Sequence, residues 1–151
     1  MIRAANPMPL DPESHRDRPL RLAFICVENA NRSQMAEAFA RAIGGVGVEV
    51  HSAGSRPKGT ISPKAVESMR RVGYELEGQA SRPITDIEHL DFDAVVTMGC
   101  GDVCPTLRAA RRQEWEIPDP RDLPPHRFDR VRDLIGQKVR ALIADLKGID
   151  M

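Results

Sequence analysis

The sequence has little of three features that mark specialised classes of protein: net charge, long apolar runs and aromatic side chains. Its 22 Lys and Arg balance its 22 Asp and Glu, which argues against a strong electrostatic surface for nucleic acid or an anionic membrane. No apolar run approaches the roughly 20 residues that span a bilayer, and residues 1–19 lack the apolar core of a secretory signal. We therefore expect a cytoplasmic protein with no nucleic-acid or membrane partner.

Cysteine is also scarce in this chain. Cys26, Cys100 and Cys104 are odd in number and too few for a disulfide framework. In a reducing cytoplasm such thiols are more often reactive, metal-binding or simply buried. The rest of the composition is that of an ordinary globular protein, because 151 residues correspond to about one domain and 41% of them are hydrophobic. The role of the three thiols is the main question that the sequence raises.

The apolar pattern alternates between strands and helices from residue 20 onward. Four prolines and no sustained period mark residues 1–19 as a flexible extension, so we expect one domain over residues 20–151. Strands are predicted at 20–26, 46–54, 91–99 and, as a short fourth, within 115–120, and helices at 33–43, 63–72 and 127–147. This alternation predicts an α/β fold with an open parallel sheet and right-handed crossovers.

Three chemically reactive segments follow predicted strands. Cys26 ends the first strand, residues 98–104 follow the third, and Asp119 lies in the loop that ends the fourth. Ligands of open parallel sheets bind beyond the carboxyl ends of the strands. We therefore expect these segments to meet at one edge of the sheet.

The loop after the first strand has the pattern C-x5-R-S. The backbone N–H groups of a tight loop and of a helix start form a cradle for a tetrahedral oxyanion, and Arg32 can hold two oxygens of phosphate or arsenate. The helix dipole and Arg32 favour the thiolate, which is the nucleophilic form of Cys26. The residues expected to surround the oxyanion are Val27, Glu28, Asn29, Ala30, Asn31, Arg32 and Ser33.

Each of these residues also has an ordinary structural interpretation. A cysteine that ends a buried strand is usually a small hydrophobic residue, and an arginine in the first helical turn is usually solvated. Asp119 in a Pro-Asp-Pro stretch is by itself a common turn residue. Their arrival together at one sheet edge favours an anion-binding nucleophile.

The chain resembles the low-molecular-weight protein tyrosine phosphatase family and, within it, the thiol-dependent arsenate reductases. The resemblance rests on CVENANRSQMAEAFAR, SAG, VVTMGCGDVCP and DP, and covers about residues 20–146. It implies a three-layer sandwich with a four-stranded parallel sheet of order 2-1-3-4 flanked by helices. It also implies Cys26 as the nucleophile, Arg32 as the oxyanion clamp and Asp119 as the general acid. Some relatives bind a potassium ion near positions that match Asn29, Glu37 and Ser52.

Electron counting separates the two activities of this family. A phosphatase needs one thiol, because water completes the reaction, whereas reduction of As(V) to As(III) needs two thiols that end as a disulfide. Cys100 and Cys104 supply a second and a third thiol. A tyrosine phosphatase should also surround an aromatic ring, yet the chain has one Tyr and one Trp, and Arg121 and Asp122 follow Asp119-Pro120. We therefore expect an arsenate reductase, with a low-molecular-weight tyrosine phosphatase as the alternative.

The expected reaction is a thiol relay. Cys26 attacks arsenate and Asp119 protonates the departing hydroxide. Cys100 then attacks Cys26, which releases arsenite, and Cys104 attacks Cys100, which leaves a Cys100–Cys104 disulfide. Thioredoxin, or glutathione with glutaredoxin or a similar small thiol, would reduce this disulfide, and no tightly bound cofactor is expected.

Three other interpretations of the sequence are weaker. Zinc would need ligands at paired spacing, but no CxxC occurs and the four histidines, His15, His51, His89 and His126, are scattered, so no metal site is predicted. An oxyanion sensor would normally carry a nucleic-acid-reading element, and the sequence has no such basic helix. Two merely buried thiols fit poorly with the glycine-rich segment around Cys100.

Overall fold

The computed structural model describes residues 18–99 and 107–148. In chain order the elements are β1 (Leu20–Cys26), α2 (Arg32–Gly44), the 3-10 helix η2 (Gly45–Gly47), β2 (Val48–Gly54), α3 (Pro63–Arg70), the 3-10 helix η3 (Ile84–Asp86), β3 (Asp91–Thr97), β4 (Arg108–Glu114) and α4 (Pro125–Lys147). Most of the predicted N-terminal extension lies outside the described residues, as do Cys100 and Cys104.

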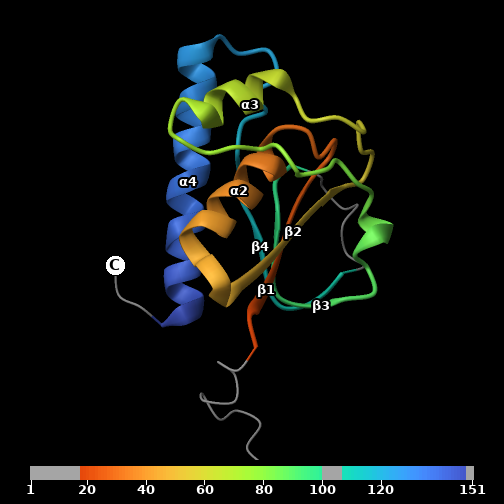
Figure 1. The fold of residues 1–151 in the computed structure, drawn as a ribbon. Helices are drawn as coiled ribbons and strands as arrows, with labels where there is room; N and C mark the ends of the chain where they lie inside the picture. Colours follow the sequence, from red (N-terminus) through yellow and green to blue (C-terminus); the bar gives the residue numbers. More distant parts are fainter. Residues whose placement is uncertain (1–17, 100–106, 149–151) are drawn as a thin grey trace, which may run out of the picture.

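The four strands form one parallel sheet in the order β2-β1-β3-β4 (Figure 1). This confirms the predicted α/β class and the strand order. β1 is central: it pairs with β2 from Leu20↔Val48 to Cys26↔Gly54, and with β3 on its other side. The carboxyl end of β1 therefore lies beside the carboxyl end of β2, and Cys26 is directly opposite Gly54.

Both faces of the sheet are covered. Helices α2, α3 and α4 lie on one face, where alternate β1 residues Leu22, Phe24 and Cys26 join the larger core (Figure 1). The intervening residues Ala23 and Ile25 face the smaller core on the other side, which the segment around η3 covers. The Cys26 side chain consequently points to the face on which α2 begins.

The position of the fourth strand differs from the prediction. β4 is Arg108–Glu114, and the residues from Trp115 to Pro120, predicted as the strand, form the loop that follows it. β4 is the edge strand, and its residues alternate between exposed and half-buried. An edge strand can carry charged side chains without burying them, so its Arg-rich sequence has no apolar run by which to recognise it. Arg108 and Arg111 form ion pairs with Asp91 and Asp145.

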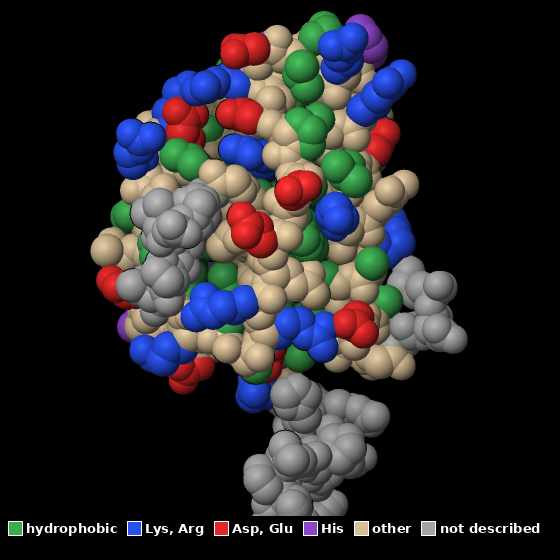
Figure 2. Space-filling model, turned by 180° about the vertical axis from the view of Figure 1, so that it is seen from behind, with side chains coloured by type: hydrophobic (Ala, Val, Ile, Leu, Met, Phe, Trp, Pro, Cys, Tyr) green, Lys and Arg blue, Asp and Glu red, His purple; other side chains and the backbone are tan. Residues whose placement is uncertain are grey.

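The surface carries charges of both signs. Figure 2 shows acidic and basic side chains interspersed over the face opposite the view of Figure 1, in agreement with the balanced composition. Within residues 18–99 and 107–148, no helix is both long and apolar enough to cross a membrane.

Candidate active site

The loop between β1 and α2 begins directly after Cys26, the last residue of β1. Cys26 is 3% exposed, and α2 begins at Arg32, so five residues connect the strand to the helix. Asn29 has φ 51°, a left-handed backbone that asparagine adopts more readily than most residues. Asn31 precedes the helix and makes no capping hydrogen bond with its side chain to any described residue. The N–H groups of the first turn of α2 are therefore free of a side-chain cap and suited to an anion.

Gly54 is essential to the shape of this loop. A Cβ atom at Gly54 would lie 2.5 Å from the carbonyl oxygen of Val27 and 3.0 Å from the backbone nitrogen of Asn29. Neither backbone atom can turn away as the end of a side chain would. The loop can approach β2 this closely because residue 54 has no side chain. The sequence analysis includes Gly54 as the last residue of a predicted strand and assigns it no role in the site, because its pairing with Cys26 appears only in the structure.

A chain of hydrogen bonds directs a hydroxyl group at the Cys26 sulfur. Asn29 Oδ1 accepts a hydrogen bond from the backbone N–H of Arg82 (2.9 Å), which fixes the orientation of the Asn29 amide. Asn29 Nδ2 therefore donates to Ser33 Oγ (2.7 Å) and to Ser52 Oγ (3.0 Å). Since Ser33 Oγ accepts from Asn29, its own hydrogen is available for Cys26 Sγ, 2.9 Å away. A donor at this distance stabilises a thiolate.

The same chain ends at a buried carboxylate. Ser52 Oγ donates to Glu37 Oε1 (2.6 Å), and Arg41 Nε donates to Glu37 Oε2 (3.0 Å). Glu37 is 4% exposed, so its negative charge needs the partners that Ser52 and Arg41 provide. The network joins β1, α2 and β2, and it holds Ser33 in place below the sulfur.

These contacts do not fit the potassium ion that the resemblance implies at Asn29, Glu37 and Ser52. The three residues are neighbours, but a hard cation requires oxygen ligands, and Asn29 presents its NH₂ group to Ser52. The Glu37 charge is already compensated by Arg41. The residues form a closed hydrogen-bonded chain in which the position of a ligand oxygen is taken by a nitrogen.

A cavity of about 430 Å³ opens above the thiol. Its lining combines the loop between β1 and α2 (residues 27–31, the nucleophile loop) with the segments that follow β2, β3 and β4. The lining residues are Cys26, Val27, Glu28, Ala30, Asn31, Arg32, Arg56, Gly99, Asp119 and Arg121. The cavity thus brings together Cys26, Arg32 and Asp119, which the sequence analysis placed at one sheet edge.

Arg32 and Asp119 approach each other across this cavity. Arg32 is 9% exposed and donates from one terminal nitrogen to the carbonyl oxygen of Ile117 (3.1 Å). Its other terminal nitrogen lies 3.9 Å from Asp119 Oδ2. The backbone N–H of Arg121 donates to Asp119 Oδ1 (3.1 Å), which orients the carboxyl group. The side chain of Asp119 is 46% exposed, so it faces the open side of the cavity.

Several cavity residues were not identified from the sequence. Arg56 and Arg121 lie in loops without a recognisable motif. The role of Gly99 becomes visible only from its backbone conformation in the structure. Gly99 has φ 83°, and a Cβ there would lie 2.6 Å from a terminal nitrogen of Arg32. Glycine at this position therefore leaves room for the guanidinium group. Of the predicted loop residues, Asn29 and Ser33 are buried beneath the loop and do not line the cavity.

Cys100 and Cys104, the second and third thiols of the expected relay, lie outside the described residues, and their roles remain predictions. Gly99, which directly precedes Cys100 in the sequence, is a lining residue of the cavity. Among the residues that the structure describes, no group of three or more His, Cys, Asp or Glu is placed to hold a metal ion.

Comparisons with known proteins agree with this geometry. The sequence profile described as "Low molecular weight phosphotyrosine protein phosphatase" matches residues 21–149. The glutaredoxin arsenate reductase of Synechocystis sp. is 33% identical over 129 residues, 83% of this chain and 98% of that protein. A solved structure described as an arsenate reductase in the phosphate binding state has 32% identity and a TM-score of 0.77, covering 83% of this chain and 98% of its own. The solved structure of a thioredoxin-dependent arsenate reductase of Corynebacterium glutamicum has 30% identity and a TM-score of 0.70. The match covers 90% of this chain and 66% of that chain.

Proposed function

Because this chain belongs to the low molecular weight phosphotyrosine protein phosphatase family, we propose that it is a thiol-dependent arsenate reductase that binds arsenate in the cavity above Cys26. One observation carries this proposal: Cys26, Arg32 and Asp119 line a single cavity whose wall also includes Gly99, the residue before Cys100. In the proposal, these three residues act as nucleophile, oxyanion clamp and acid, and the sequence continues from Gly99 into a segment with two further thiols.

The cavity is suited to a tetrahedral oxyanion. Backbone N–H groups of the loop from Val27 to Asn31 and of the first turn of α2 supply donors, and the guanidinium group of Arg32 supplies a bidentate cation. Among the described residues, the side-chain oxygen of Asn31 is buried without a hydrogen-bond partner. This oxygen would accept a hydrogen bond from the hydroxyl group of a hydrogen arsenate ion.

The first step forms a bond between sulfur and arsenic. The Cys26 thiolate, stabilised by Ser33, attacks As(V), and one arsenic–oxygen bond breaks. Asp119 donates a proton to the departing oxygen, which leaves as water. Arg32 holds the remaining oxygens during this exchange. Arsenic is still As(V) in the adduct, so no electrons have yet been transferred.

The second step transfers two electrons. The Cys100 thiolate attacks the Cys26 sulfur, the sulfur–arsenic bond breaks, and its electron pair leaves with arsenic as arsenite. Cys104 then attacks Cys100, which restores the Cys26 thiolate and leaves a Cys100–Cys104 disulfide. An external dithiol or two small thiols supply the two electrons that reduce this disulfide. Without an external thiol, a chain with Cys26 alone would stop at the arsenate adduct.

The mouth of the cavity favours this activity over tyrosine phosphatase activity. Its side chains at positions 56 and 121 are arginines, and no aromatic residue lines the described cavity. Tyr74 packs against Phe39 in the helical core, with ring centroids 5.1 Å apart, and Trp115 is 6% exposed. A phosphotyrosine ring would therefore find no aromatic surface beside Cys26.

The electron donor is a thiol redox protein or a small thiol. The relatives named above include one described as a glutaredoxin arsenate reductase and one described as thioredoxin-dependent. Both systems belong to the reducing cytoplasm, where we place the reaction. There the reduction of arsenate would serve detoxification and arsenical resistance.

A coupled assay tests the proposed function. Purified protein with arsenate is supplied with thioredoxin, thioredoxin reductase and NADPH, or in parallel with glutathione, glutaredoxin and glutathione reductase. We expect arsenite formation and NADPH oxidation in at least one system, and neither in Cys26→Ser, whose folding is checked by circular dichroism. Hydrolysis of an aryl phosphate with no arsenite in either system would overturn the proposal and support a phosphatase.

A further inference from the structure

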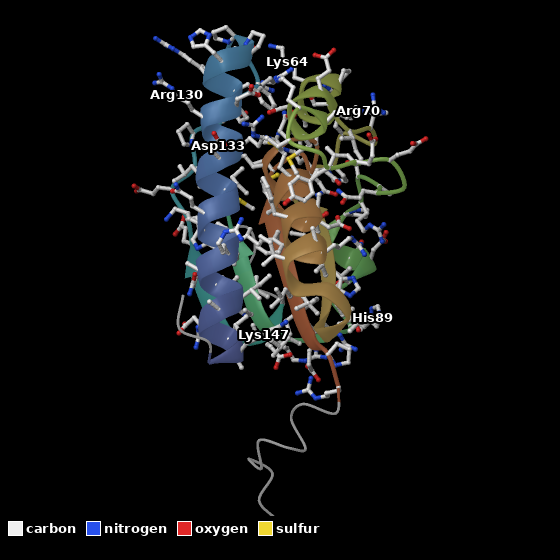
Figure 3. All side chains as sticks on the ribbon, turned by 60° about the vertical axis from the view of Figure 1, so that its left-hand side comes forward. Lys64, Arg70, His89, Arg130, Asp133 and Lys147 are labelled. Atoms are coloured by element: carbon white, nitrogen blue, oxygen red, sulfur yellow. The ribbon has the colours of Figure 1, made fainter. Side chains whose placement is uncertain are left out.

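The loop that carries Asp119 has no regular secondary structure but is attached at two points. Lys64 Nζ donates to the backbone carbonyl oxygens of Arg121 (2.9 Å) and Leu123 (3.4 Å). On the other side, a terminal nitrogen of Arg121 donates to Glu28 Oε2 (3.4 Å). Lys64 lies at the start of α3, next to the segment that leads into α4 (Figure 3).

Both attachment points are held by further hydrogen bonds: Glu28 belongs to the nucleophile loop, and Lys64 is close to a residue hydrogen-bonded to that loop. The backbone oxygen of Glu28 accepts hydrogen bonds from the N–H of Lys58 (2.9 Å) and the hydroxyl of Ser81 (3.2 Å). The residue that caps α3, Ser62, donates its N–H to the backbone oxygen of Ala30 (3.0 Å) and accepts one from the Lys64 N–H. Movement of the Asp119 loop away from Cys26 would therefore break contacts to a fixed framework.

A carboxylate at position 28 needs an explanation, because it lines a cavity built for an anion. Its negative charge opposes the binding of arsenate unless a cation compensates it. Arg121 provides that charge, and Arg121 is two residues from Asp119, to which its N–H donates. The ion pair with Arg121 therefore gives Glu28 a role in holding the Asp119 loop.

We propose that Glu28 and Lys64 are positioning residues that clamp the Asp119 loop over the nucleophile loop. This proposal rests on the role of Asp119 in the proposed function, and neither Glu28 nor Lys64 takes part in the reaction itself. The clamp predicts that loss of the Glu28 contact or of the Lys64 contact loosens the backbone of residues 119–123. It also predicts that loss of the Lys64 contact slows the reaction only through Asp119.

Backbone exchange tests the clamp without reference to activity. Hydrogen exchange in the native protein is compared for wild type, Lys64→Met and Glu28→Ala in the segment 119–123. Lys58→Met removes the same charge as Lys64→Met from an exposed side chain, so it is the matched control for that variant. We expect exchange of the Arg121 and Leu123 amides to accelerate about threefold or more in the two clamp variants, as for a partly exposed charged contact, and to be unchanged in the control. Equal exchange in all four proteins would overturn the clamp.

A double-mutant cycle then tests the link to Asp119. Arsenite formation in a single turnover is measured for wild type, Lys64→Met, Asp119→Asn and the double variant. If Lys64 is a positioning residue, Lys64→Met should lower the rate about threefold in the wild-type background and leave the rate of Asp119→Asn unchanged. The affinity for phosphate should be the same in Lys64→Met as in wild type. An equal loss in both backgrounds would show that Lys64 does not act through Asp119.

Failure of the proposed function would look different from failure of the clamp. If wild type forms no arsenite, the reductase proposal fails, and the exchange experiment still decides whether the loop is clamped. If wild type forms arsenite but exchange is the same in every variant, the reductase proposal stands and the clamp is wrong.

Discussion

Substitution of Gly54 by alanine should destabilise the protein and disturb the oxyanion loop together. The new Cβ would lie 2.5 Å from the Val27 oxygen, about 0.9 Å inside ordinary van der Waals contact at 3.4 Å. The Val27 oxygen also accepts a hydrogen bond from the Arg56 N–H (2.8 Å), which the displacement would strain. Overpacking of this kind costs about 1–3 kcal/mol, and a lost hydrogen bond adds about 1 kcal/mol. We expect Gly54→Ala to lower the free energy of unfolding by about 2–4 kcal/mol.

Urea denaturation and phosphate titration measure the two effects of this substitution. Gly47→Ala is the matched control, because a Cβ at Gly47 meets only the flexible end of Lys147 at 3.4 Å, and we expect it to be neutral. Phosphate should bind Gly54→Ala at least tenfold more weakly than wild type, because the atoms that move belong to the loop from Val27 to Asn29. Wild-type stability and phosphate affinity in Gly54→Ala would refute the argument that this close approach shapes the site.

Two further substitutions test the ion pairs and the hydrogen bonds. The hydrogen bond from Arg71, together with one from Ser68, lowers the pKa of Asp129 below its usual value near 4, so Asp129 stabilises the fold above that pH and loses its effect as the pH falls through the folded-state pKa. Asp129→Asn should therefore lower the free energy of unfolding by about 1 kcal/mol at pH 7, as measured by urea denaturation, and this difference from wild type should shrink below about pH 4. A difference independent of pH would show that the Asp129 charge does not stabilise the fold. Ser33→Ala removes the donor to Cys26 Sγ and should slow single-turnover arsenite formation about tenfold in rapid-quench measurements, whereas an unchanged rate would show that the hydroxyl does not stabilise the thiolate.

The sequence allowed the central part of the fold to be predicted because its signals are local. β1 is an apolar run buried on both faces, and α2 combines a helical stripe with Gly44 and Gly45 at its end. The position of Cys26 between these elements follows from the same patterns. The left-handed residue in the loop was predictable because asparagine is one of the few residues that adopt this backbone readily.

The parts that could not be predicted depend on neighbours distant in the sequence. β4 has an arginine-rich sequence, and its strand conformation comes from pairing with β3 and not from an apolar pattern of its own. The Glu28–Arg121 contact joins residues 93 positions apart, and the Asn29 network depends on the N–H of Arg82. Such contacts follow from the positions of loops in three dimensions, which residue types alone do not determine.

The most direct test of the thiol relay is to trap its intermediate in Cys104→Ser. Pre-reduced Cys104→Ser is mixed with arsenate, quenched with acid and an alkylating agent, and analysed by peptide mass spectrometry, with Cys100→Ser as the matched control. The relay predicts about one arsenite per protein together with a Cys26–Cys100 disulfide in Cys104→Ser, and no arsenite in Cys100→Ser. Arsenite released by Cys100→Ser as fast as by Cys104→Ser, with no disulfide that includes Cys26, would contradict the account.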